Sequence, residues 1–320
     1  MSNRLIGWVG SVVLGVLVSS ASAQDFPNKQ VRLIVPFPPG GTLDIVGRML
    51  ASRLTEVWKQ PVVIENRAGA SGNIGVDAIA KSPADGYHLV IVATPVVTSP
   101  HLQKLPFDVT RDLAAVTQTA MLEYLLVVNP KLGVGSVAEF VALTQRESGK
   151  HSYGSAGNGS GQHLYMELFK GVTKASLTHV PYKGSAPMLQ AVMAGELAAA
   201  FDVSISALPL VRSARVRALA LTGNKGSDNV PGAVALASLY PEFSIDTWHG
   251  ILAPAGTPRA VLEKLSRDIG DVVFSPEIAS RFRDVGLTPR RSTPDEFSKI
   301  IRDDLDRWGK VIRDNNIKAD

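Results

Sequence analysis

The stretch VPFPPGGTLDIVGRML, residues 35–50, joins an apolar strand to an amphipathic helix through a turn of prolines and glycines. The first N–H groups of a helix have no intrahelical partner, and the helix dipole places partial positive charge there. Gly40 and Gly41 leave that backbone open to close approach, so the stretch is a candidate cradle for a carboxylate or phosphate. The alternative is an ordinary turn in which Thr42 caps the helix and Asp44 complements the dipole.

Strands and helices alternate along the chain outward from this turn, as far as residue 223. Such a series of βα units predicts a mostly parallel sheet covered by helices. It divides into two blocks, residues 30–122 and 123–223, and three further helices follow residue 257. We expect an α/β protein with two lobes and a ligand cleft between them. Lobe 1 comprises residues 24–122 and 224–320, lobe 2 comprises residues 123–223, and the hinge strands lie near 122–128 and 216–223.

The first 23 residues have the pattern of a secretory signal peptide. Arg4 precedes an apolar run from Leu5 to Val18, and Ala21-Ser22-Ala23 forms a small-residue cleavage site. A transmembrane anchor is the alternative, but the run is short for a span of about 20 residues. We therefore expect cleavage after Ala23 and a free, soluble periplasmic protein.

Composition excludes several classes of protein. The 320 residues are 45% hydrophobic and 19% charged, with a net charge of +4 and no Lys/Arg block, so nucleic acid is not an expected partner. The chain has no cysteine, which excludes disulfides, thiol chemistry and thiolate metal sites. We expect a monomer without a cofactor.

A second glycine-rich loop lies in YGSAGNGSGQHLYMELFK, residues 153–170, again between a strand and a helix. Two such loops at the carboxyl ends of strands, one in each lobe, would face each other across the cleft. Their helix N-termini could then bind the two ends of a small dianion. Thr94 and Asp202 each end a predicted strand at this rim, and Tyr182 begins a third turn of this kind. Asp202 could receive a ligand hydroxyl, amine or water, or could cap the helix near Ser204.

Enzyme signatures are missing. No G-x-S-x-G surrounds Ser155 or Ser160, and no P-loop or dinucleotide fingerprint is present. The six histidines show no metal-ligand spacing. A serine-type hydrolase using Ser155 or Ser160 with His163 remains the enzymatic alternative, but we expect a non-catalytic protein without a metal.

The segments VPFPPGGTLDIVGRML, VIENRAGASGNIGVDAIAKSPADGYHLV, YGSAGNGSGQHLYMELF, HVPYKGSAPMLQAVMAGEL, RALALTG and GILAPAGTP occur in this order. Together they resemble the periplasmic solute-binding proteins of tripartite tricarboxylate transporters, the Bug family. The resemblance implies a type II periplasmic-binding-protein fold that binds a small carboxylate and delivers it to integral-membrane permease subunits. The implied ligand-binding residues are Phe37, Pro39, Gly40, Gly41, Thr42 and Asp44 in the first lobe, and Ser155, Asn158, Gly159, Ser160, His163, Tyr182 and Asp202 in the second.

Three features depart from the family pattern. Leu43 occupies a position where a small or hydroxylated residue is more usual, Ala198 and Ala199 replace more polar residues, and residues 224–243 lack the usual proline-threonine pattern. These departures affect the identity of the carboxylate rather than the fold; di- and tricarboxylates, aromatic acids and amino acids all stay open. A sensory role, in which a membrane receptor binds the closed form, is a further alternative.

Overall fold

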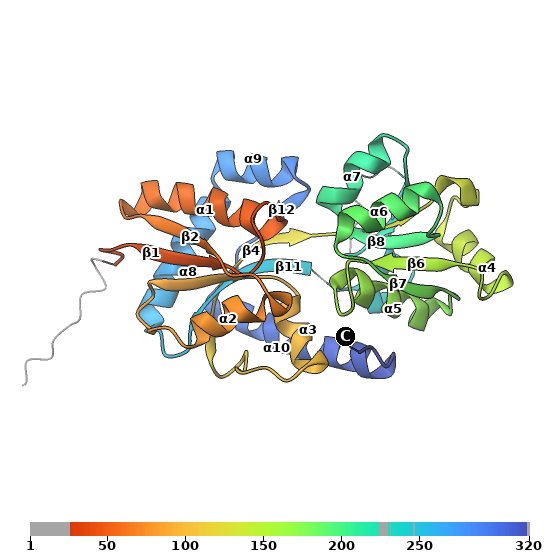
Figure 1. Ribbon diagram of the computed structural model, residues 1–320. Coiled ribbons are helices and arrows are strands. Elements are labelled where there is room, and N and C mark those ends of the chain that lie inside the picture. The colour runs from red at the N-terminus through yellow and green to blue at the C-terminus, as the bar shows by residue number, and fades with distance from the viewer. Residues whose placement is uncertain (1–25, 224–229, 231, 246, 319–320) are drawn as a thin grey trace, which may run out of the picture.

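The computed structural model describes residues 26–223, 230, 232–245 and 247–318, and it has two lobes side by side (Figure 1). Each lobe is built on one six-stranded sheet with helices packed against it. The two-lobed α/β fold predicted from the sequence is therefore confirmed.

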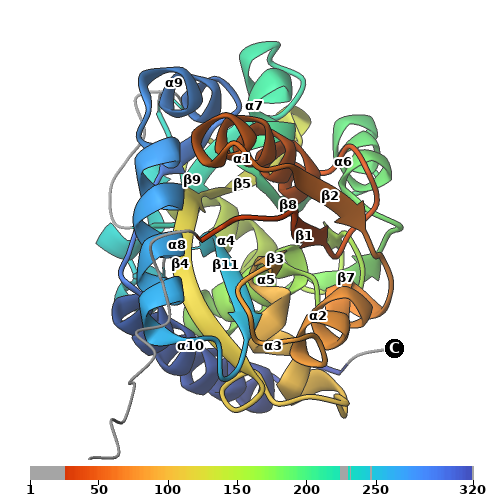
Figure 2. The ribbon, with the colours of Figure 1, turned by 90° about the vertical axis from the view of Figure 1, so that its left-hand side faces the viewer.

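The first lobe contains the sheet with strand order β12-β4-β11-β3-β1-β2. Its strands are β1 (Val31–Val35), β2 (Val62–Asn66), β3 (His88–Val92), β4 (Leu113–Leu122), β11 (Thr247–Pro254) and β12 (Leu287–Pro289). Its helices are α1 (Thr42–Trp58), α2 (Asn73–Ala80), α3 (Pro95–Leu102), α8 (Arg259–Val273), α9 (Pro276–Asp284) and α10 (Pro294–Asp314). Figure 2 shows α1 and α8 on one side of this sheet and α2 and α3 on the other.

The second lobe contains the sheet with strand order β10-β9-β5-β8-β6-β7. Its strands are β5 (Tyr124–Val128), β6 (Ser152–Ser155), β7 (Thr178–Pro181), β8 (Ala199–Val203), β9 (Arg217–Leu221) and β10 (Val234–Ala235). Its helices are α4 (Val137–Arg146), α5 (Gly161–Thr173), α6 (Ser185–Ala194) and α7 (Ser204–Arg212). Short 3-10 turns lie at Ala70–Gly72, Pro130–Leu132, Leu236–Ser238 and Pro241–Phe243.

Both sheets are mixed: most strands of each run in one direction, as predicted, and β5, β11 and β12 run against them. Strands β1, β2 and β3 are parallel, but β11 runs antiparallel to both β3 and β4. In the second lobe, β5 runs antiparallel to β8 and β9. The sequence analysis missed β4 and β11. Strand β4, LAAVTQTAML, is rich in alanine and threonine rather than in the branched apolar residues that mark a buried strand.

The crossings between the lobes differ from the prediction in one place. The chain first crosses where β4 ends at Leu122 and β5 begins at Tyr124, as expected. The second predicted hinge, 216–223, is wrong, because β9 pairs with β5 inside the second sheet. Strand β10 also pairs with β9, so the chain is still in the second lobe after residue 224, where lobe 1 was expected to resume. The return crossing lies between β10 and β11.

Helix α10 connects the two lobes along their lower side (Figure 1). Its N-terminus has a capping box, since Thr293 and Glu296 exchange hydrogen bonds between side chain and backbone. Farther along, the Trp308 ring meets Tyr165 of α5 edge-on, with 5.3 Å between ring centroids. At the start of α8, Pro258 is the N-cap, and the Thr257 hydroxyl donates to the Pro254 carbonyl.

Candidate anion-binding cleft

A cavity of about 710 Å3 lies between the lobes, where strand ends of both sheets meet. The first lobe contributes residues that follow β1, β2 and β3 and residues of β4 and β11: Phe37, Pro38, Pro39, Gly41, Thr42, Leu43, Ser71, Ala93, Thr94, Pro95, Leu122, Thr247 and His249. The second lobe contributes Tyr124, Ala156, Gly157, Asn158, Gly159, Ser160, Gly161, Gln162, Gly184, Ser185 and Val203. None of these described residues is Asp, Glu, Lys or Arg.

Among the helices that start at this cavity are α1 at Thr42, α5 at Gly161 and α6 at Ser185. The residues in their first turns have backbone N–H groups without intrahelical partners. The dipoles of the three helices also add partial positive charge at the same place. An anion bound here would therefore be held by backbone donors and dipoles, without a countercharge from a side chain.

Asp44 fixes the shape of the first loop instead of lining the cavity. Its Oδ2 accepts from Arg48 Nε at 2.9 Å and from the Gly40 N–H at 2.9 Å, and its Oδ1 accepts from Asn66 Nδ2 at 2.9 Å. The hydrogen bond from Arg48 is the main cause that lowers the Asp44 pKa to about 2. Because Gly40 already donates to Asp44, and neither residue lines the cavity, we assign both to positioning rather than to ligand contact.

The second-lobe loop is fixed by a stack of aromatic side chains. His163 Nδ1 accepts from the Gly159 N–H at 3.1 Å, and its ring lies 4.0 Å from that of His179, nearly parallel. His179 Nε2 in turn lies 2.7 Å from Ser155 Oγ. Ser155 and His163 are both buried and do not line the cavity. They hold Asn158, Gly159 and Ser160 at its wall.

Asp202 also lies behind the wall. Its Oδ1 accepts from Gln162 Nε2 at 3.0 Å and from Ser185 Oγ at 2.7 Å, and both of those residues line the cavity. Its Oδ2 is enclosed without a partner, and burial is the main cause that raises the Asp202 pKa to about 6. Asp202 does not cap α7, whose N-cap is Val203. It orients two side chains at the N-termini of α5 and α6.

The remaining predicted residues also divide into those that line the cavity and those that do not. Phe37, Pro39, Gly41, Thr42 and Thr94 line the cavity, whereas Tyr182 is half-buried and packs against apolar residues of the second lobe. Leu43, noted as a departure from the family pattern, also lines the cavity.

Among the lining residues that the sequence analysis missed, two groups differ in whether the sequence could have shown them. Gln162 and Ser185 were open to detection, since each follows a Gly-rich turn at a helix start. Leu122, Thr247 and His249 belong to β4 and β11, the two strands that went unrecognised, so nothing indicated their position.

Among the titratable side chains that line the cavity are Tyr124, whose pKa is raised by burial, and His249. Only 3% of it is exposed, and its Nδ1 has no hydrogen-bond partner. Burial lowers the His249 pKa to about 4, so the ring is neutral near pH 7.

The hydrolase alternative has no geometric support. Ser155 Oγ pairs with His179 rather than His163, and it is fully buried. The Ser160 hydroxyl caps α5 by accepting from the His163 N–H. A nucleophile needs a base within hydrogen-bond reach and access to substrate, and neither serine has both.

Within the described residues, no three His, Asp or Glu side chains gather as metal ligands. No helix in that part of the chain is long and apolar enough to cross a membrane.

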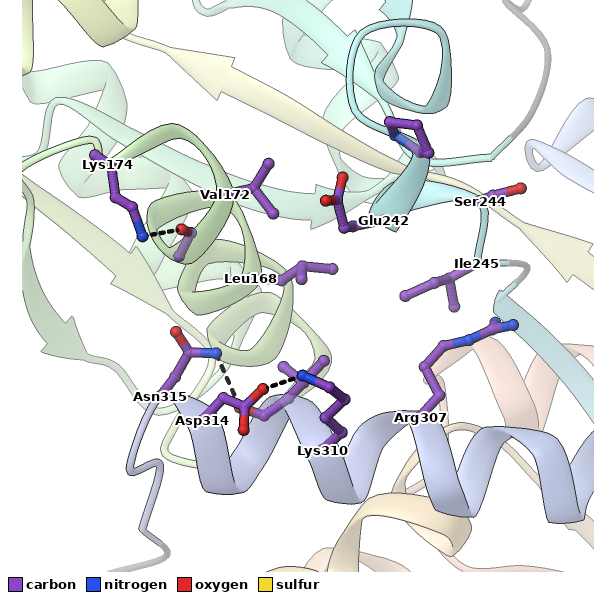
Figure 3. A pocket seen from close by; sticks show the side chains of 13 residues that line it. Leu168, Val172, Lys174, Glu242, Ser244, Ile245, Arg307, Lys310, Asp314 and Asn315 are labelled. Carbon is purple, nitrogen blue, oxygen red and sulfur yellow. Dashed lines mark hydrogen bonds and ion pairs between the residues drawn. The ribbon is translucent and has the colours of Figure 1, made fainter.

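A second cavity of about 690 Å3 lies between α5, the 3-10 turn Pro241–Phe243 and α10 (Figure 3). Its basic groups already have partners. Lys310 pairs with Asp314, Arg307 lies 3.3 Å from Asp304, and Lys174 Nζ donates to the Gly171 carbonyl at 2.7 Å. It shares no lining residue with the interlobe cavity, and none of its lining side chains has a buried polar atom without a partner. The interlobe cavity is therefore the candidate site.

Residues 46–317 match the tripartite tricarboxylate transporter family receptor. The protein BugT of Bordetella pertussis is 36% identical over 316 residues, covering 96% of this chain and 97% of BugT. A Rhodopseudomonas palustris protein solved with adipate has a TM-score of 0.81 and 33% identity over 92% of this chain and 100% of that one. MatC from Rhodopseudomonas palustris, solved with bound malate, has a TM-score of 0.76 and 25% identity over 90% of this chain and 100% of that one.

The family match spans most of the chain, and the BugT similarity spans nearly all of it. The periplasmic binding protein BugD, at 24% identity and a TM-score of 0.78, shares the fold. This is a family of solute-binding receptors rather than enzymes, in agreement with a cleft that has backbone donors and no accessible nucleophile–base pair. The chain therefore belongs to the tripartite tricarboxylate transporter receptor family, as its sequence motifs predicted.

Proposed function

We propose that this protein binds a small carboxylate in the interlobe cavity and delivers it to the permease subunits of a tripartite tricarboxylate transporter. The observation that carries the proposal is the meeting of three helix N-termini at a cavity without charged lining residues among those described. Such a site favours an anion over a cation or a neutral sugar, because the available groups are N–H donors at positive dipole ends.

The comparisons support a carboxylate rather than a phosphate. The similar proteins from Rhodopseudomonas palustris were solved with adipate and with malate, and both have the same two-lobed fold. Leu43, Leu122 and Val203 line the cavity here. These apolar side chains suit a hydrocarbon chain between polar ends better than a compact inorganic anion.

The proposed mechanism is closure around the anion. A carboxylate first docks at the N-terminus of α1, on Gly41 and Thr42. The lobes then rotate about the two crossings, β4 to β5 and β10 to β11, and bring the N-termini of α5 and α6 onto the ligand. Exclusion of water strengthens hydrogen bonds to the charged ligand, and the permease binds the closed form.

Export precedes this function. We propose that residues 1–23 are removed after Ala23 and that the mature protein acts as a monomer in the periplasm. N-terminal sequencing of the protein recovered from the periplasm, and its mass in solution, test these two points.

The carboxylate cradle is tested by replacing Gly41 with valine. Gly41 has φ −76° and ψ 168°, which valine adopts readily, and a Cβ there would meet only the Pro38 carbonyl oxygen at 3.7 Å. The added side chain would cover the N–H groups of α1 at a cost to folding of about 1 kcal/mol or less. Gly135→Val is the matched control, because Gly135 precedes α4 outside the cavity and its Cβ would lie 3.7 Å from the Glu139 carboxylate.

Thermal unfolding of the mature protein would be followed with adipate, malate, citrate, phosphate and glucose. A ligand at about 100 times its dissociation constant stabilises the native state by roughly 2.7 kcal/mol. We expect a carboxylate to raise the melting temperature of the wild type and of Gly135→Val but not of Gly41→Val. If Gly41→Val binds the carboxylate as well as the wild type does, the α1 cradle is wrong.

A further inference from the structure

His249 belongs to β11 and lines the cavity. Strand β3 separates β1 from β11, so the loop after β1 and the start of β11 lie two strands apart on the same sheet edge. Neighbouring strands are about 4.8 Å apart, which places His249 roughly 10 Å along this edge from the end of β1. A ligand held at the α1 N-terminus could therefore reach His249 only with its other end.

The state of the His249 side chain indicates a missing partner. A buried polar atom without a hydrogen bond is rare, because desolvation is not compensated. Nδ1 of His249 is such an atom, on a side chain that is 97% buried and lines the cavity. Burial is the only cause of its lowered pKa, so no charged group of the described residues contributes to that shift. Because Nδ1 is enclosed, a ligand would meet the part of the ring that lines the cavity, and there it can supply a hydrogen bond that the protein does not.

The groups around His249 indicate which kind of ligand group would bind there. An ammonium group is disfavoured by the three helix N-termini that face the cavity. A carboxylate can accept a hydrogen bond from the imidazole, and its charge would also favour protonation of the ring. Between the two ends, Leu43 and Leu122 offer apolar contact. This arrangement matches a methylene chain with a carboxylate at each end.

We propose that His249 is a specificity-determining residue, which donates a hydrogen bond to the second carboxylate of an aliphatic dicarboxylate whose first carboxylate lies at the α1 N-terminus. This inference rests on the proposed function of the same cavity. It predicts that the protein discriminates between a dicarboxylate and a monocarboxylate of equal length, and that His249 is the cause.

The test is calorimetric titration of the mature protein with adipate, hexanoate and 6-hydroxyhexanoate, near pH 7. A hydrogen bond to a charged group corresponds to a discrimination of about ten- to a hundredfold. We expect the wild type to prefer adipate over hexanoate by that factor. In His249→Phe the preference should fall to about threefold or less, mainly through weaker adipate binding. His249→Gln, which retains an amide donor, should keep part of it.

A matched control is His101→Gln. His101 of α3 also has a buried ring nitrogen without a partner, Nε2, but it does not line the cavity. This variant should keep the full adipate preference. Melting temperatures of the unliganded variants separate misfolding from lost recognition, and His249→Gln serves if the phenylalanine variant does not fold.

Titration in two buffers of different ionisation enthalpy adds a second readout. Adipate should cause proton uptake by the wild type, and this uptake should be smaller in both His249 variants, in which Asp202 remains a titratable group at the cavity wall. An unchanged adipate preference in a folded His249→Phe overturns the inference while leaving the cradle intact. Equal binding of 6-hydroxyhexanoate and adipate overturns the assignment of a second carboxylate. If no carboxylate binds the wild type, the proposed function itself fails.

Discussion

Replacement of Asp202 by asparagine should stabilise the unliganded protein, and increasingly so as the pH rises. The carboxyl group is fully buried, and Oδ1 accepts from Gln162 and Ser185 while Oδ2 has no partner. Burial raises its pKa from 3.8 to about 6. An asparagine Oδ1 can accept the same two hydrogen bonds without carrying a charge.

The sign and size of the effect follow from proton linkage. A raised pKa means that the native state prefers the protonated carboxyl. The stability that this proton confers is complete below pH 3.8 and is lost as the pH rises through about 6. Above that pH the buried charge costs about 3 kcal/mol, at 1.36 kcal/mol per pKa unit. The difference between Asp202→Asn and the wild type should therefore grow by about 2 kcal/mol between roughly pH 4.5 and pH 8.

Urea unfolding of both proteins, followed by tryptophan fluorescence at several pH values, measures this difference. Other titrating groups, such as His249, are the same in both proteins and cancel. Asp112→Asn provides a control of opposite sign: the hydrogen bond from Arg111 is the main cause that lowers the Asp112 pKa to about 2, so this variant should be less stable than the wild type near pH 7. An Asp202→Asn difference that stays constant with pH, or that favours the wild type throughout, would refute the reasoning.

Two further substitutions test the packing and the cradle. Gly250→Ala should destabilise the first lobe by about 1 to 3 kcal/mol, because a Cβ on Gly250 would overlap the Phe297 ring; urea unfolding measures this cost, and an unchanged midpoint would contradict it. Asn66→Ala should weaken carboxylate binding by several-fold without removing a ligand contact, because Asn66 holds the first loop through the Phe37 carbonyl and Asp44. Titration of this variant should show the loss, and wild-type affinity would mean that the loop holds its shape without Asn66.

Local patterns allowed prediction of the helix starts around the cavity and of the two lobes. The strand–turn–helix pattern around Gly41 and that around Ser160 lie within about twenty residues each. Their signals are side-chain volume, capping and apolar periodicity, all of which act between near neighbours in the chain. The sequence therefore determined which loops carry open helix N-termini, and its motifs determined the family.

The roles of individual residues around these loops depended on the tertiary structure. Asp44, Ser155, His163 and Asp202 were predicted as ligand contacts, and each has polar partners that place it behind the wall instead. The sequence shows the same carboxylate or imidazole whether the side chain contacts a ligand or lies behind the cavity wall. Only the three-dimensional positions of its partners decide whether it faces a ligand or holds a loop.

Strands β4 and β11 likewise could not be predicted from local sequence. They pair along their length although more than 120 residues separate them, and neither forms a local apolar pattern that stands out. Their burial comes from neighbours on both sides of the sheet, so it is a property of the assembled lobe rather than of the segment. For this reason the sequence indicated an anion site between two lobes, whereas the tertiary structure alone showed that His249 lines it.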